Sequence, residues 1–115
     1  PNIVNVATIN GKTDVFALTT TETNLVTATA NTVFKINTIM VSNIDGTNAA
    51  DVTIKYNDGS NDRAIASTIS VPADATLAVV DKNSAFYLEE NEIIKGTASA
   101  NSDLECLISY EIISD

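Results

Sequence analysis

The chain of 115 residues contains no histidine, no tryptophan and a single cysteine. Without histidine, neither a Ser-His nor a Cys-His nucleophile pair can form, and three-histidine metal sites are excluded. Cys106 cannot form an internal disulfide, which excludes a disulfide-stapled secreted scaffold and fits folding in a reducing cytoplasm. Its parity places Cys106 on the core face of a strand, where a thiol is usually a small buried hydrophobe rather than a nucleophile.

Basic side chains are also scarce. Six Lys and Arg stand against 15 Asp and Glu, which gives a net charge of −9. This charge repels phosphate backbones and anionic membranes, so we expect neither nucleic acid nor a membrane as a partner. No stretch approaches the ~18 apolar residues of a membrane span. The segment PNIVNVATIN at 1–10 lacks the basic region and long apolar stretch of a signal peptide.

Acidic residues provide the only candidates for hydrolytic chemistry. Glu89, Glu90 and Glu92 crowd one turn and could act as paired carboxylates in glycoside hydrolysis. Solvated turn charges are the simpler interpretation, because acidic and amide residues are common in turns. We therefore expect no catalytic residue, and the protein is predicted not to be an enzyme.

Ligand-binding patterns are equally weak. The Asp/Asn-rich segments 45–48 and 57–62 could offer oxygen atoms to Ca²⁺, but neither has the spacing of an EF-hand, and β-turns require the same residues. Tyr56, Tyr87 and Tyr110 are few for the aromatic platform of a sugar-binding module. We expect no cofactor and no metal.

The residues that are present favour β-structure, since Val, Ile, Ala, Leu and Thr are abundant. The segment 33–56 is predicted to form two strands folded back on each other around Asp45-Gly46, a dipeptide suited to tight hairpin turns. In its first strand, residues 33–43, the apolar parity changes part-way. That strand is therefore either covered on both faces or interrupted by a bulge.

Short alternating segments separated by turn residues occupy the rest of the chain. Asn10-Gly11 predicts a turn, segment 57–62 a second hairpin connection, and Pro72 a corner after a strand that alternates from Ile65 to Val71. The longest alternation runs from Leu104 to Ile113. The predicted strands are 25–29, 33–43, 52–56, 65–71, 76–80, 85–88, 92–98 and 104–113; residues 1–9 are either a further strand or an extended arm, and residues 15–18 are a short apolar run.

In this closing segment, one face is predicted to enter the core: Leu104, Cys106, Ile108, Tyr110 and Ile112. No segment has helical periodicity. The sequence thus predicts a single all-β domain over 1–115, an antiparallel β-sandwich of jelly-roll type with about eight or nine strands.

Four short motifs within residues 25–113 resemble a recurrent pattern in small virion proteins of tailed bacteriophages. They are SNIDG at 42–46, VPA at 71–73, LEE at 88–90 and IKGTAS at 94–99, and an alternating strand follows them. Members of this group are capsid decoration (cement) proteins, tail or neck accessory proteins and fibre-associated modules. The resemblance implies a non-catalytic β-sandwich with no catalytic residues to transfer.

The resemblance implies a structural protein of the virion, most directly a capsid decoration protein that stabilises the head through contacts between subunits. Its partners would be phage capsid or tail structural proteins and further copies of itself, and its location the virion, after synthesis in the bacterial cytoplasm. The alternative is a host-surface or glycan-binding module of a phage tail or fibre. A bacterial surface domain is a more remote third class.

Residues 1–9 lie outside the shared pattern and are apolar and β-branched, as expected for a strand that adds to a neighbour's sheet edge. The predicted interface consists of Ile3, Val4, Val6 and Ile9. Two interpretations stay open: the segment is an extended arm that contacts a neighbouring subunit, or it is the first strand of the domain's own sheet.

Overall fold

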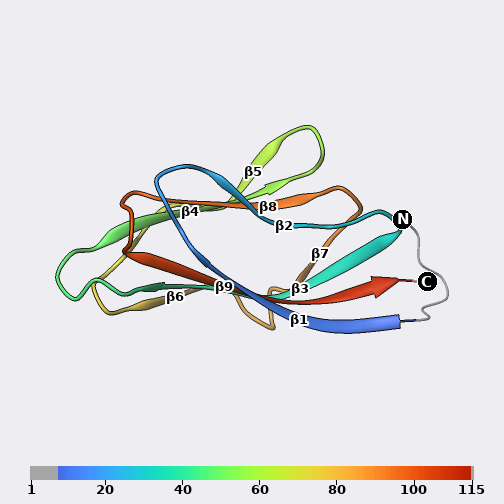
Figure 1. Ribbon diagram of the computed structural model, residues 1–115, viewed down its shortest axis with the longest axis horizontal. Helices are drawn as coiled ribbons and strands as arrows, with labels where there is room; N and C mark the ends of the chain where they lie inside the picture. Colours follow the sequence, from blue (N-terminus) through green and yellow to red (C-terminus); the bar gives the residue numbers. More distant parts are fainter. Residues whose placement is uncertain (1–7, 115) are drawn as a thin grey trace.

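The computed structural model describes residues 8–114, and within this range every regular element is a β-strand (Figure 1). The nine strands are β1 (Thr8–Ala17), β2 (Thr23–Thr27), β3 (Thr32–Asn43), β4 (Ala50–Asn57), β5 (Asp62–Val71), β6 (Thr76–Val80), β7 (Phe86–Leu88), β8 (Ile93–Ala98) and β9 (Leu104–Ser114). Over these residues there is no helix long and apolar enough to span a membrane.

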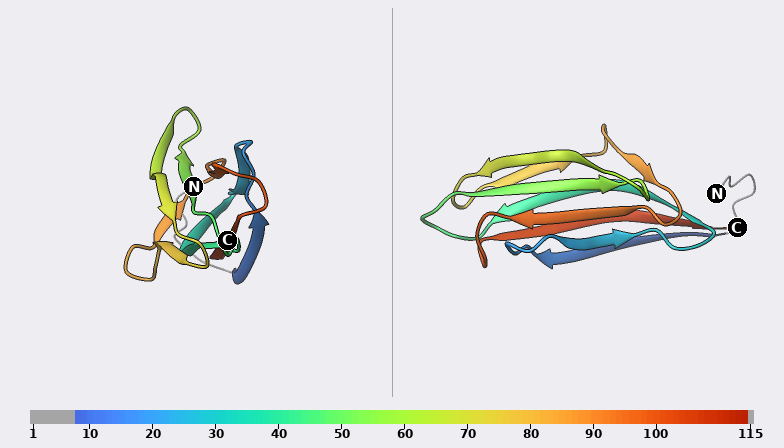
Figure 2. Two further views of the ribbon diagram at one scale, coloured as in Figure 1. Left: turned by 90° about the vertical axis from the view of Figure 1, so that its left-hand side faces the viewer. Right: turned by 90° about the horizontal axis from the view of Figure 1, so that it is seen from above.

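The strands form two antiparallel sheets that face each other. The first sheet has the order β1-β9-β3-β6, with β7 also paired to β3, and the second has the order β2-β8-β4-β5. Figure 2 shows the two layers end-on and the long sandwich from above. Its extents are 50 × 26 × 21 Å. The predicted all-β antiparallel sandwich is confirmed.

The strand pairs are nested, as if the whole chain were one long antiparallel hairpin folded over on itself. Four successive strand pairs, β1 with β9, β2 with β8, β3 with β6 and β4 with β5, are nested inside one another. Successive pairs alternate between the two sheets, and the loop between β4 and β5 is the tip of the hairpin. The predicted hairpin connection at 57–62 is therefore confirmed.

β9 provides the centre of the first sheet, because it lies between β1 and β3. Its alternation places Glu105 in solvent and Ile112 at the margin of the core. The buried side chains of this strand are four of the five predicted: Leu104, Cys106, Ile108 and Tyr110.

β3 carries the bulge that its mixed parity indicated. Phe34 and Ile36 face the core before the bulge, and Ile39 and Val41 face it afterwards. The register against β9 shifts between Ile36 and Thr38. One inserted residue thus returns the apolar side chains to the core, as a one-residue change of register requires.

The prediction of a hairpin around Asp45-Gly46 is wrong, because β3 and β4 belong to different sheets. Gly46 does not adopt the positive φ that a tight type I′ turn requires. Instead, the buried amide of Asn43 donates to the carbonyl oxygens of Asn48 and Val71, at 3.0 and 2.9 Å. These bonds hold a corner that carries the chain from one sheet to the other.

Two further local predictions differ from the structure. Asn10-Gly11 is not a turn but lies inside β1, where tertiary pairing with β9 overrides the local turn preference. In β5, Ile69 is 41% exposed, and the buried residues are Ala66 and Val71. Thr68 has a φ of 51°, and the register against β4 shifts on either side of Ile54, so the predicted parity is interrupted.

Candidate functional site

Of the four predicted interface residues, the structure places one. Ile9 lies in β1, pairs with Ile113 of β9 and is 58% exposed. Ile3, Val4 and Val6 lie outside the described residues.

Of the three glutamates near residue 90, Glu90 and Glu92 accept hydrogen bonds from other groups of the fold. Glu92 accepts the Glu89 N–H at 2.8 Å and the hydroxyl of Tyr56. Glu90 accepts the N–H of Asn31. Burial, and then the contact with Glu92, raises the pKa of Tyr56 above its ordinary value. The carboxylates of Glu90 and Glu92 thus hold this turn to the segments around Asn31 and Tyr56.

In the Asp/Asn-rich turns, the carboxylates of Asp45 and Asp58 accept hydrogen bonds from backbone N–H groups of the same turn. Asp58 Oδ1 accepts the N–H groups of Ser60 and Asn61, at 2.9 and 2.8 Å. These bonds lower the pKa of Asp58, because they favour its charged form. Within residues 8–114, no group of three or more acidic or cysteine side chains is placed to hold a metal ion.

Tyr56, Tyr110 and Cys106 make contacts within the fold that leave them unavailable to a ligand. Tyr110 is buried, stacks on Phe34 with ring centroids 5.1 Å apart, and donates its hydroxyl to Asp14 at 2.6 Å. Cys106 is buried, and this raises the pKa of its thiol to about 12, so that little thiolate forms at neutral pH. Tyr87 has an exposed ring.

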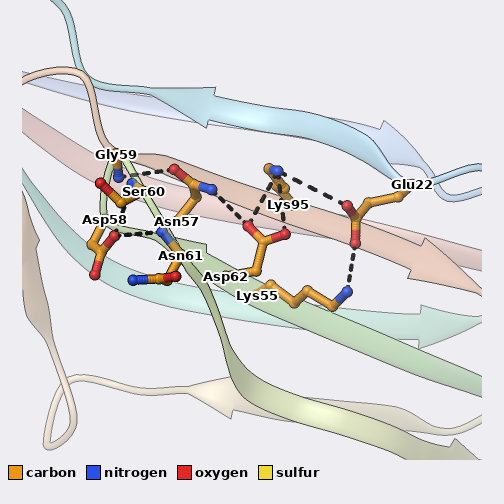
Figure 3. Close-up of polar contacts among 9 residues, drawn as sticks. All are labelled: Glu22, Lys55, Asn57, Asp58, Gly59, Ser60, Asn61, Asp62 and Lys95. Carbon is orange, nitrogen blue, oxygen red and sulfur yellow. Dashed lines mark hydrogen bonds and ion pairs between the residues drawn. The ribbon is translucent and has the colours of Figure 1, made fainter.

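The outer face of the second sheet carries two lysines, and each lysine is paired with an acidic side chain (Figure 3). Lys55 and Lys95 lie directly opposite each other on β4 and β8. Glu22 Oε2 lies 2.9 Å from Lys55 Nζ, and Asp62 Oδ1 lies 3.1 Å from Lys95 Nζ. The pKa of Asp62 is lowered by a hydrogen bond from Asn57 and then by Lys95. These pairs offset the repulsion between the two lysines.

The outer face of the first sheet is more apolar. Four side chains from four strands stand side by side in register there and form the apolar row: Val15 of β1, Leu107 of β9, Met40 of β3 and Ala78 of β6. Val15 is 72% exposed, and a groove of about 420 Å³ opens beside it. Solvent-facing apolar side chains arranged across a whole sheet indicate a contact surface.

A second apolar patch lies at the other end of the same face. It consists of Ile9, Ile113 and Val33, which are register partners on β1, β9 and β3. The predicted interface residue Ile9 therefore shares a face with the apolar row.

Sequence reasoning missed the apolar row, although part of its signal was visible. Met40 and Leu107 are apolar residues on the solvent parity of their strands. Their alignment with Val15 depends on the pairing register of segments about 90 and 65 residues apart, which turn chemistry and alternation do not determine.

Comparison with family models finds no match, and no curated protein sequence matches. Two solved structures share the fold at low sequence identity. One comes from Bacillus endospore appendages, described as disulfide-linked pili, with a TM-score of 0.55, 11% identity, and coverage of 94% of this chain and 88% of that one. The other comes from an acid-stable capsid of a Helicobacter pylori bacteriophage, with a TM-score of 0.55, 7% identity, and coverage of 95% and 90%.

Proposed function

We propose that this chain is a non-catalytic structural protein of a tailed-phage virion, and that it decorates the capsid as a cement protein. The observation that carries this proposal is the apolar row, which faces outward with Val15 exposed and Met40 and Leu107 half-buried. The similarity to a phage capsid structure and to a pilus structure supports it, because both are assemblies. The nested strand order supports a jelly roll, which is common in viral capsids.

In this role the protein stabilises the head by binding its assembled form. Burial of the apolar row against capsid subunits favours the assembled particle by mass action. With a net charge of −9, attachment relies on apolar and main-chain contacts, so its salt dependence is modest. The buried Cys106 takes no part, so the disulfide linkage described for the appendage is not proposed here.

Copy number tests this function. Quantitative mass spectrometry of intact particles is expected to find the protein in hundreds of copies per head, as symmetry requires of a decoration protein. A few copies per particle would instead favour the alternative, a host-surface or glycan-binding module on the tail or fibre. The exposed ring of Tyr87 is the structural feature that favours this alternative.

A surface variant tests which face attaches. Met40→Glu places a charge in the middle of the apolar row on the central strand β3, and binding to particles is expected to fall. The matched control is Thr97→Glu on β8, at the outer face of the second sheet, where binding is expected to be unchanged. Loss of binding in the control alone would place attachment on the charged face.

The arm hypothesis for Ile3, Val4 and Val6 belongs to the same proposal. Because Thr8 and Ile9 pair with β9, a deletion that probes the arm ends at residue 7. The shortened protein is expected to keep its melting temperature and to lose binding to particles or to further copies. A large fall in melting temperature would mean that the segment stabilises the domain's own sheet.

A further inference from the structure

β1 presents a long and regular strand edge. It ends the first sheet, and its ten residues pair with β9 without a shift in register. Within residues 8–114, the backbone groups of β1 that point away from β9 have no strand partner, over about 33 Å at ~3.3 Å per residue. An edge of this kind is a template for pairing with another strand.

The other sheet edges are short or irregular. β2 and β6 have five residues each, and the pairing of β2 is shifted at Asn24. β5 is as long as β1, but its register shifts twice and Thr68 adopts a φ of 51°. Short strands and bulges discourage pairing at an edge. β1 carries neither feature.

The charges of β1 select one register for a second copy. Lys12 and Asp14 lie on the same side of the strand, with Nζ and Oδ1 3.7 Å apart. If two β1 strands pair antiparallel about a two-fold axis at Thr13, Lys12 of each copy faces Asp14 of the other. An axis at Lys12 would face two lysines, and an axis at Asp14 two aspartates. Opposite charges across a strand pair stabilise it, and like charges destabilise it.

The outward side chains fit the same register. Among residues 8–114, Val15 and Ile9 are the two most exposed large apolar residues, at 72% and 58%. With the axis at Thr13, Val15 faces Gly11 of the second copy and lies diagonal to its Ile9. A Cβ on Gly11 would meet nothing within 4 Å, so packing inside one copy does not require this glycine. Glycine inside a strand often marks the close approach of another backbone.

The geometry points to a second copy of this chain as the partner of β1, paired antiparallel about a two-fold axis at Thr13. The first sheets of the two copies then join into one continuous sheet, and their apolar rows lie on the same outer side. This inference deepens the homo-oligomeric part of the proposed function. It concerns the free protein in solution, so its failure is separate from that of the copy-number experiment.

Sedimentation velocity of the purified chain with charge variants tests the pairing. The wild-type protein is expected to sediment as a dimer of the 12.1 kDa chain. Lys12→Asp and Asp14→Lys are each expected to be monomeric, because like charges then face each other. An equimolar mixture of the two variants is expected to dimerise again, since each acidic position of one chain meets a basic position of the other. A dimer that survives Lys12→Asp would overturn the register.

Cross-linking gives a second test that does not alter the charges, because Asp14→Lys also removes the acceptor of Tyr110. Facing residues in antiparallel pairs have Cα atoms about 4.5–5.5 Å apart, which suits a disulfide. Thr13→Cys is therefore expected to form a disulfide-linked dimer on mild oxidation. Ser109→Cys, its partner on β9, is one strand away from the axis and is expected to remain uncross-linked. A wild-type monomer, or cross-linking of both variants alike, contradicts the proposal.

Discussion

Ile108 and Glu105 lie on the same strand but on opposite faces of the first sheet. Ile108 is fully buried, and Glu105 is exposed. Ile108→Ala is expected to lower the free energy of unfolding by roughly 2–5 kcal/mol, the range for large-to-small changes in a packed core. Glu105→Ala is expected to change it little. Denaturant unfolding measures both, and equal losses would mean that the two faces are assigned wrongly.

Gly96 occupies a position where a side chain would be crowded. A Cβ there would lie 2.7 Å from Leu25 Cδ1 and 3.1 Å from Leu18 Cδ2. Gly96→Ala is expected to cost about 1–3 kcal/mol, because these packed side chains must shift.

Gly11→Ala is the matched control for Gly96→Ala. A Cβ at Gly11 meets open space within one copy, so in dilute, monomeric protein this change is expected to raise the free energy of unfolding by about 0.5–1 kcal/mol. Denaturant midpoints compare the two variants. If they shift in the same direction, crowding by the leucines is not the cause.

At the residue scale, the sequence allowed the core of β9 to be predicted because its alternation is long and unbroken. The prediction of the core-facing residues of β5 was wrong, because Thr68 adopts a left-handed conformation at a bulge and Ile69 is left exposed. Threonine rarely adopts positive φ, so composition gives no warning of such a residue.

At the element scale, the hydroxyl of Tyr110 in β9 links this strand to Asp14 in β1. Burial, and then the bond to Asp14, raises the pKa of Tyr110 above its ordinary value. The folded state therefore holds this proton more tightly than the unfolded state. The free energy of unfolding is expected to fall as the pH rises through about 10, the ordinary tyrosine pKa.

Unfolding curves on both sides of that pH test the linkage. Tyr110→Phe is expected to reduce the decline, and the part that remains is assigned to Tyr56 and Lys55, whose pKa values are also raised. A decline of unchanged steepness in Tyr110→Phe would argue against the role of this hydroxyl.

The ion pairs of Figure 3 join Glu22, just before β2, to β4 and β8, and join β8 to Asp62 at the start of β5. Glu22→Gln removes the partner 2.9 Å from Lys55 Nζ and leaves this lysine opposite Lys95. The melting temperature is expected to fall at low salt, and the difference from wild type is expected to shrink at high salt, because ions screen exposed charges. Glu105→Gln, on the other sheet opposite Ser42 and Ala17, serves as a control. A difference that does not depend on salt would indicate lost packing instead.

Elements were predicted more reliably than their pairing. The segments that became β3 and β4 were both expected, and yet the chain crosses between sheets after β3 instead of turning back. The corner depends on the amide of Asn43, which reaches Val71 at the end of β5. A contact between residues so distant in sequence cannot be inferred from the Asp-Gly dipeptide that follows Asn43.

At the scale of the whole molecule, composition and alternation were sufficient for the all-β class and the two-layer sandwich. The candidate surface was not predictable, because its apolar row exists only once β1, β9, β3 and β6 are aligned. On each strand alone, its residues resemble the scattered apolar side chains that ordinary surfaces carry.

The central position of β9 also bears on biosynthesis. β9 follows the other eight strands in the chain, but β1 and β3 of the first sheet pair through it. While residues 104–114 are still inside the ribosome, the strands already made cannot close this sheet. Nascent chains arrested before Leu104 are therefore expected to be digested by protease, and chains arrested well beyond Ser114 to resist it. Until that point, the cell must keep the apolar strands of the unfinished chain apart from one another.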